Sequence, residues 1–256
     1  MRELLRVVEE PRPCPYIPVE KASLEYRIVV DLDSAVYADL LRRGYRRFGY
    51  QLYRPACSEC NQCVSLRILV DEFAPTASQR RVLRLNRHIR SELCPAGVSD
   101  QHIDLFNRYH RFMATHRGWQ RDAITSDAYV ESFVAGGGTF SWQWLYYDGP
   151  RLVGVALMDE VMDAISLVYY FHDPAWRPHS PGTFSMLTQL AYAKEKKLPY
   201  AYPGYWVASN PSMNYKVRFR PNERLAHYPA DGDDPRWVRT AAQDPGGEAH
   251  RKSEVH

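Results

Sequence analysis

The stretch Phe140-Ser-Trp-Gln-Trp-Leu-Tyr-Tyr147 begins the part of the chain that decides the fold. Two further apolar segments follow it, and the first connection, Asp148-Gly-Pro150, is a typical hairpin turn. A longer amphipathic segment and a short apolar one complete the run. This order predicts three antiparallel strands, a helix and then a parallel strand. The five segments are 140–147, 151–159, 164–171, 183–196 and 199–203.

The same order of elements is found in the N-acetyltransferases that use acetyl-coenzyme A. In that architecture two central strands splay apart into a V-shaped groove, and the loop before the helix presents unpaired amides that hold phosphate. Here the loop is 177–182, and we expect Ser180 and Gly182 to contact the substrate or a tRNA. An ordinary helix N-terminus uses the same residues, so the loop alone does not identify a ligand. The predicted fold class is α+β, with a mixed antiparallel sheet flanked by helices.

Three cysteines lie three residues apart, at Cys57, Cys60 and Cys63, and a fourth, Cys14, lies in the proline-rich stretch 11–18. Steps of three residues bring thiols to one side of a tight turn, which suits a shared zinc ion or iron-sulfur cluster. A reduced thiol site that senses oxidation and simple packing are the two other interpretations. We expect these four cysteines to be the metal ligands.

Positive charge is concentrated in the first half of the chain. Residues 1–120 carry 19 Lys and Arg against 14 Asp and Glu, whereas the remainder carries 14 against 16. A helix predicted over 78–92 places Arg80, Arg84 and Arg87 on one side. Because guanidinium groups bind phosphate with two hydrogen bonds, this side predicts a nucleic-acid partner. A solvated arginine-rich surface would have the same composition.

The chain has 256 residues, 45% of them hydrophobic, which is enough for two modest domains. We predict a basic, cysteine-bearing α/β domain over 1–100, an acyltransferase domain over 101–230 and a disordered tail over 231–256, where polar residues replace the apolar pattern. No apolar run approaches the roughly 20 residues of a membrane span, and the first ten residues are too charged for a secretory signal. We therefore expect a cytoplasmic protein with no membrane partner.

Ten motifs in order along the chain resemble the aminoacyl-tRNA-protein transferase family of the arginyltransferase type, in its short bacterial branch of aspartate/glutamate leucyltransferases. The chain departs from the pattern at Pro181 and Pro203, where leucine is more usual and a loop tolerates proline. The matching motifs are Pro13-Cys-Pro-Tyr16, Tyr53-Arg-Pro55, the cysteine triplet, Gln79-Arg-Arg81, His116-Arg-Gly118, Ser166 to Asp173, Ser180 to Phe184, Gly204-Tyr-Trp206, Tyr215-Lys216 and Phe219-Arg-Pro221.

The resemblance implies an enzyme that moves leucine from leucyl-tRNA to the α-amine of proteins or peptides that begin with Asp or Glu, which marks them for N-end rule degradation. It implies no cofactor for the transfer beyond the tRNA itself. Eukaryotic relatives carry a cluster through a comparable cysteine set, which favours zinc or an iron-sulfur cluster here. An aminoacyl ester is already activated, so the reaction needs a positioned, deprotonated amine and stabilisation of an oxyanion.

Three groups of side chains are candidates for these tasks, and each also has an ordinary structural interpretation. Two aspartates beside a hairpin turn could accept the proton of the amine or simply cap the turn. Three cations could bind the acidic first residue or lie on an edge strand. Tyr215 and a group of aromatic residues could contact the tRNA, by stacking on its terminal adenosine, or pack in the core. The members of these groups are Asp159 and Asp163; Lys216, Arg218 and Arg220; and Tyr202, Tyr205 and Trp206.

Three other functions stay open at this point. The donor could be arginyl-tRNA instead of leucyl-tRNA. The chain could be a small-molecule N-acetyltransferase that binds acetyl-coenzyme A through loop 177–182. The N-terminal half could also act alone as a non-catalytic, nucleic-acid-binding metal module.

Overall fold

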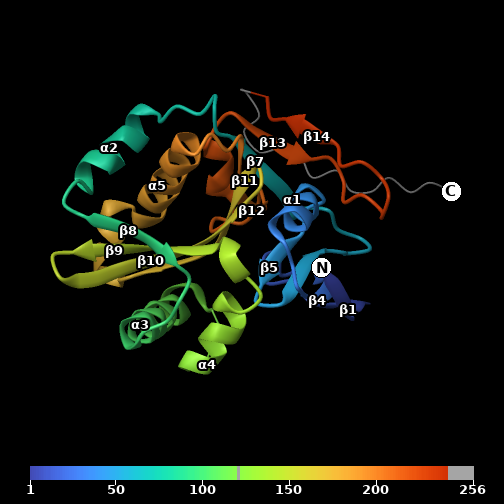
Figure 1. Cartoon of the computed structure of the whole chain (residues 1–256), viewed down its shortest axis with the longest axis horizontal. Coiled ribbons are helices and arrows are strands. Elements are labelled where there is room, and N and C mark those ends of the chain that lie inside the picture. Colours follow the sequence, from blue (N-terminus) through green and yellow to red (C-terminus); the bar gives the residue numbers. More distant parts are fainter. Residues whose placement is uncertain (120–121, 242–256) are drawn as a thin grey trace.

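A computed structural model of the chain describes residues 1–119 and 122–241, and within these residues two main sheets form the fold (Figure 1). The larger sheet has eight strands in the order β14-β13-β7-β12-β11-β10-β9-β8. These strands are β14 (Trp237–Arg239), β13 (Asn222–Leu225), β7 (Val64–Leu69), β12 (Tyr200–Trp206), β11 (Ala164–His172), β10 (Arg151–Val161), β9 (Ser141–Asp148) and β8 (Arg90–Pro95).

Strands β9, β10 and β11 form the antiparallel meander that the opening sequence predicts. Their apolar residues alternate between two faces, and helices cover both (Figure 1). On one face α5 (Pro181–Glu195) packs Leu187 and Leu190 against Ile165. On the other, α3 (Asp100–Arg117) packs Phe106 against Phe171, followed by α4 (Ser126–Tyr129) and a π-helical turn, η1 (Val130–Val134). Both layers of the predicted acyltransferase fold are therefore present.

Strands β11 and β12 are parallel but pair over only three residues each, 164–166 with 200–202. Beyond Tyr202, β12 continues alongside β7, where Tyr205 is paired with Ser65, while β11 continues to His172. The two strands therefore separate, as the sequence predicted. The parallel pair is joined through the 3-10 turn η3 (Pro174–His179) and α5.

The first 55 residues form the second sheet, in the order β1-β4-β6-β5. Helix α1 (Ser34–Arg42) begins at Asp33, whose side chain accepts a hydrogen bond from the Val36 amide, and it packs Tyr37 against Phe140. The small ladder of β2 (Arg12–Pro13) and β3 (Lys21–Ala22) lies between β1 and β4 in the sequence. The four strands are β1 (Arg2–Val8), β4 (Leu24–Val30), β6 (Gln51–Pro55) and β5 (Arg46–Phe48).

The eight-stranded sheet crosses the domain boundary that we predicted at residue 100. Strand β7 lies between β13 and β12, and β8 pairs with β9, so the first 100 residues supply two of its strands. A fragment of residues 1–100 would leave both strands without their neighbours. This arrangement does not favour an N-terminal half that works alone.

Two local expectations were wrong. The helix predicted over 78–92 is α2 (Ala77–Leu85), which ends where buried Asn86 donates to the carbonyls of Val82 and His179 and accepts from Trp176. The predicted tail contains β14, paired with β13. Residues 242–256 lie outside the described residues. Among the described residues no helix is long and apolar enough to cross a membrane.

Candidate functional site

Arg46 lies at the point where β11 and β12 separate. It comes from β5 in the other sheet, and only 5% of it is exposed. Its Nη1 donates to the Tyr202 carbonyl at 3.1 Å, and its Nη2 donates to the Leu167 carbonyl at 2.6 Å. Tyr202 is the last residue of β12 that pairs with β11, and Leu167 directly follows Ser166, the last such residue of β11. One guanidinium group therefore takes the place of the missing ladder bonds.

Lys216 lies beside this guanidinium group. It is on the 3-10 turn η4 (Asn214–Arg218), is 8% exposed and donates from Nζ to the Tyr205 carbonyl at 2.9 Å. Burial, and after it the charge of Arg46, lower the pKa of Lys216 to about 7. A Cβ atom added to Gly204 would lie 3.3 Å from Lys216 Nζ and 3.9 Å from Arg46 Nη2. Both cations therefore border the same point of the β12 backbone, where a side chain would crowd Lys216.

No carboxylate in residues 1–119 and 122–241 forms an ion pair with Arg46 or Lys216. Their hydrogen bonds in this part of the chain go to backbone carbonyls and to the Met213 sulfur. A buried cation is normally paired, because leaving water costs several kcal/mol that only an opposite charge offsets. The base of the split therefore attracts an anion.

Aromatic hydroxyls gather around the open part of β11. Burial raises the pKa of Tyr170, and the phenols of Tyr146, Tyr109 and Tyr215 raise it further. The ring centroids of Tyr146 and Tyr170 lie 6.5 Å apart. Burial also raises the pKa of Tyr215 to about 12, so its phenol stays protonated and can donate a hydrogen bond. The split therefore has two cations at its base, and buried phenols lie along the part of β11 beyond it.

The loop before α5 adjoins these phenols. Ser180 has a left-handed φ of 55°, and its side chain forms no capping hydrogen bond with the first turn of the helix. A Cβ at Gly182 would lie 3.7 Å from the ring of Tyr170, so the first turn of α5 lies beside β11 beyond the split. Contact of Ser180 and Gly182 with a substrate stays a prediction.

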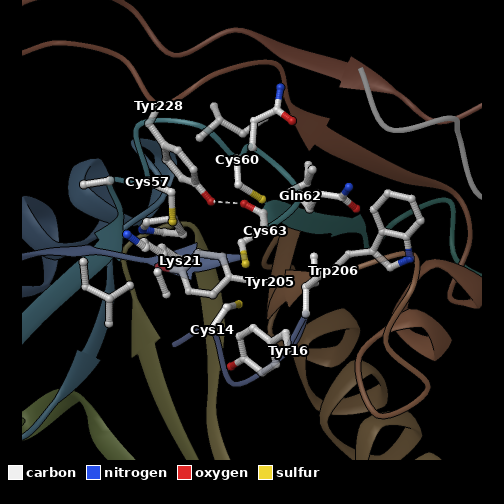
Figure 2. A pocket seen from close by; sticks show the side chains of 18 of the residues that line it. Cys14, Tyr16, Lys21, Cys57, Cys60, Gln62, Cys63, Tyr205, Trp206 and Tyr228 are labelled. Atoms are coloured by element: carbon white, nitrogen blue, oxygen red, sulfur yellow. Dashed lines mark hydrogen bonds between the residues drawn. The ribbon is translucent and has the colours of Figure 1, made fainter. Parts of the chain in front are cut away.

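A cavity of about 690 Å³ lies beside β12 and is shown in Figure 2. The side chains of Cys14, Cys57, Cys60 and Cys63 gather around it, together with Tyr205 and Trp206 of β12 and Tyr16. Burial and then the thiols of Cys14, Cys57 and Cys60 raise the pKa of Cys63 to about 12. The four cysteines therefore share one cavity.

The arginines of α2 lie on the surface. Arg80, Arg84 and Arg87 are all exposed, and α2 packs on α5 through its other side. Helix α2 lies on the same side of the sheet as α5 (Figure 1), and Arg87 follows the end of α2.

Comparison with known proteins gives a consistent match over both halves. The sequence pattern described as "Arginine-tRNA-protein transferase, N terminus" matches residues 12–81, and the pattern for the C terminus matches residues 101–226. A protein from Helicobacter hepaticus named aspartate/glutamate leucyltransferase is 36% identical over 236 residues, which cover 91% of this chain and 98% of that protein. The chain belongs to the arginine-tRNA-protein transferase family.

Other relatives and solved structures complete this comparison. A protein of the same name from Marinobacter nauticus is 36% identical over 230 residues, which cover 88% of this chain and 94% of that protein. Among solved structures, L-PGS from Bacillus licheniformis has a TM-score of 0.44 at 12% identity and matches 67% of this chain and 49% of its own. FemX has a TM-score of 0.43 at 12% identity and matches 72% and 63%.

Each of the two predicted catalytic aspartates of this transferase-family chain is paired with an arginine, although Asp159 lies opposite Ser166, where β11 stops pairing with β12. Asp159 is 1% exposed and accepts two hydrogen bonds from Arg47, at 2.8 and 3.0 Å, and another from Ser141. Asp163 lies in the turn before β11 and pairs with Arg42 of α1 at 3.0 Å. Both carboxylates hold elements of the fold together, so their placement does not support a role in deprotonating a substrate amine.

The predicted cations and aromatic residues are only partly brought together. Lys216 is at the split, but Arg218 is exposed and Arg220 donates to the Ala241 carbonyl. Tyr202 lies in the core, edge-on to Trp237. Tyr205 bonds through its hydroxyl to two carbonyls, and Trp206 lies under the guanidinium of Arg224, so both aromatic residues line the cysteine cavity instead.

Arg46 is the residue that the sequence reasoning missed. Its own neighbourhood, Tyr45-Arg-Arg-Phe48, has the pattern of a strand and gives no sign of a site. The signal that was available was its position among 11 arginines between Arg42 and Arg90 with only three acids, too few to pair them all.

The four cysteines offer the right atoms for the predicted metal. Thiolates are the usual ligands of structural zinc and of iron-sulfur clusters, and four of them line one cavity here. Within the described ranges, no three His, Cys, Asp or Glu side chains are arranged so that they could hold a metal ion. The donor set thus fits such a group in composition, and the metal stays a prediction.

Proposed function

We propose that this chain transfers leucine from leucyl-tRNA to the α-amine of proteins that begin with Asp or Glu. The relatives that are 36% identical over most of both chains carry the name of this activity. The observation that carries the proposal is the separation of β11 from β12 in a chain of this family, because it provides a groove for the two substrates. The reaction takes place in the cytosol, where charged tRNA is available.

The two faces of the groove suit the two substrates. The exposed Arg80 and Arg84 lie on α2 and Arg87 follows it; α2 packs on α5, and the first turn of α5 lies beside Tyr170 at Gly182. A tRNA that lay on the arginines with its phosphates would have its charged end near this helix terminus. The acceptor would then enter along the open side of β11.

The transfer needs one bond to form and one to break. The nitrogen of the acceptor amine attacks the carbonyl carbon of the leucyl ester, and the bond from that carbon to the ribose oxygen of the terminal adenosine then breaks. The amine loses one proton, and the ribose oxygen takes one up as it leaves. An α-amine has a pKa of about 8, so a useful fraction is neutral without a strong base. Phenols such as Tyr170 and Tyr215 can donate hydrogen bonds to the oxyanion.

We also propose that Cys14, Cys57, Cys60 and Cys63 hold zinc or an iron-sulfur cluster. Such a group would join the segment around Cys14 to the connection between β6 and β7, and so support the strand that lies beside β12. No step of the transfer passes through it. Elemental analysis of the purified full chain should find one metal site, and Cys63→Ser should lose it; a metal-free wild-type chain with full activity would contradict this assignment.

The proposed function is tested by supplying leucyl-tRNA and arginyl-tRNA, each with a labelled amino acid, side by side to the full chain and a peptide that begins with Asp. Label should pass from leucyl-tRNA to the peptide. Transfer from arginyl-tRNA alone would replace leucine by arginine as the donor, and retention of both labels on tRNA would reject the transferase. Calorimetry with coenzyme A should show no binding, whereas a small-molecule N-acetyltransferase would bind it.

A further inference from the structure

We propose that Arg46 and Lys216 form the pocket for the side-chain carboxylate of the acceptor's first residue. This inference rests on the proposed function and names the part of the same site that selects the acceptor.

The first argument is the charge at the base of the split. Arg46 is 5% and Lys216 is 8% exposed, and neither forms an ion pair with a carboxylate in the described part of the chain. Two neighbouring cations in this state repel each other and lack the solvation of bulk water. A bound carboxylate would remove both costs. Selection for an acidic partner thus follows from the fold itself.

The second argument is the closeness of the two groups. Gly204 has a φ of +94°, a conformation that favours glycine, and a Cβ atom added to it would crowd Lys216 Nζ at 3.3 Å. The same Cβ atom would lie 3.9 Å from Nη2 and 4.0 Å from Nε of Arg46, which is the edge of a guanidinium group that binds carboxylates with two bonds. Donors from both side chains therefore border the same point of the β12 backbone.

The third argument is the chemistry of the reaction. The carboxyl group of the donor leucine is tied up in its ester with the tRNA, so the carboxylate that belongs beside the reacting amine is the side chain of the acceptor's first residue. Only a few bonds separate that carboxylate from the α-nitrogen. A carboxylate between Arg46 and Lys216 would therefore hold the amine at the split, next to the open part of β11.

The other candidate cations lack this setting. Arg218 is exposed, so water competes for its hydrogen bonds and an ion pair there contributes about 1 kcal/mol or less. A site discriminates strongly against an amide that replaces a carboxylate only when its own polar groups are desolvated and would be left unpaired. Among the cations that we predicted, Lys216 meets this condition, and Arg46 supplies its partner.

The experiment compares two peptides that differ only in their first residue, Asp or Asn, with the full chain and with Lys216→Met. Two quantities are measured: the ratio of kcat/KM for leucine transfer to the two peptides, and the ratio of their Kd values by calorimetry without tRNA. Wild type should prefer Asp in both. Lys216→Met should lower each ratio by about 10- to 100-fold, mainly through the Asp peptide, whereas Lys216→Arg should restore part of it.

The matched control is Lys196→Met, the same change at an exposed lysine at the end of α5, which should keep both ratios. If folded Lys216→Met keeps the wild-type preference for Asp in binding, the carboxylate pocket is elsewhere and the inference is wrong. If wild type transfers no leucine, the proposed function fails, and the binding ratios still decide between a carboxylate pocket at Lys216 and none. Near-ultraviolet circular dichroism of each variant identifies a chain that has not folded.

Discussion

Arg46 and Arg47 follow one another in β5, yet their guanidinium groups lie in two regions that use a buried positive charge differently. Arg47 is 2% exposed and makes two hydrogen bonds to Asp159, one to Ser141 and others to the carbonyls of Gly49 and Ala135. Arg46 is 5% exposed and bonds to two carbonyls where β11 and β12 separate.

The difference shows that β5 can carry a structural side chain, Arg47, next to a candidate site residue, Arg46. Successive side chains of a strand point to opposite faces, so neighbours in sequence reach separate environments. Where a carboxylate of the chain completes the pair, as Asp159 does, the charge is satisfied and has a structural role. Where no carboxylate among residues 1–119 and 122–241 does, as at Arg46 and Lys216, the proposed acceptor carboxylate would supply the counter-charge.

The largest expected effect is on the buried ion pair of Arg47 and Asp159. Asp159→Asn would leave the guanidinium of Arg47 buried without its counter-charge, and should lower the free energy of unfolding by about 3–5 kcal/mol. Urea denaturation of the full chain measures this. The control is Asp104→Asn, which removes the exposed partner of Arg108 and should cost less than about 1 kcal/mol. Equal, small effects of the two changes would mean that Asp159 is free for another role.

The stability of the chain should respond in the opposite direction when the cation pair of Arg46 and Lys216 is changed. Lys216→Met removes a buried cation that has no carboxylate partner in the described residues, so the free energy of unfolding should stay the same or rise by about 1–4 kcal/mol, although transfer to acidic acceptors falls. Thermal unfolding of both proteins at neutral pH checks this. A marked loss of stability would show that Lys216 belongs with Arg47, as part of the fold.

A smaller effect on stability is expected at the exposed arginines of α2. Replacing Arg80, Arg84 and Arg87 together by Ala should change the free energy of unfolding by less than about 0.5 kcal/mol for each residue. If each contacts one phosphate, the slope of log affinity for tRNA against log salt should become shallower by about 2–3. Filter binding over a salt series measures it.

The control for this prediction is the replacement of three exposed arginines on other surfaces. It should keep the wild-type slope, and a triple α2 variant with the same slope as this control would show that α2 faces away from the tRNA. The control residues are Arg2, Arg111 and Arg236.

The last effect appears only on acidification and concerns His172, on the part of β11 past the split. Burial, and then the charge of Arg177, lower the pKa of His172 to about 4, against about 6.5 in an unfolded chain. Between these values the unfolded chain binds a proton that the folded chain does not, so stability falls as pH falls through this window.

The fall should be on the order of 1 kcal/mol between pH 6.5 and pH 5, because His172 is only partly buried. Denaturation of wild type and His172→Gln at these two pH values measures it, and the variant should lose less stability on acidification. The exposed His116→Gln is the control. A difference between wild type and His172→Gln that does not change with pH would contradict this account.

Much of the fold could be predicted because its signals are local. Alternating apolar residues and the turn at Asp148-Gly149-Pro150 define the β9-β10 hairpin, and the apolar side of α5 follows from its own sequence. Local signals failed where tertiary contacts decide. Asn86 ends α2 early because its side chain bonds to His179 and Trp176, far away in the sequence.

The site was harder to predict for the same physical reason. Lys216 was a candidate because it lies in a recognisable motif, but its partner Arg46 bonds to residues 121 and 156 positions away, which only the fold brings together. Asp159 had the right residue type near the right strands, and the burial of Arg47 beside it could not be seen from its neighbours. The sharing of one cavity by four cysteines agrees with their spacing, whereas the metal itself stays a prediction.

The most direct test of the account is a crystal structure of the full chain with a bound peptide that begins with Asp. The side-chain carboxylate should lie within hydrogen-bonding distance of Lys216 Nζ and of the Arg46 guanidinium, with the α-amine at the split between β11 and β12. A carboxylate bound to Arg218, to the arginines of α2 or inside the cysteine cavity would contradict it.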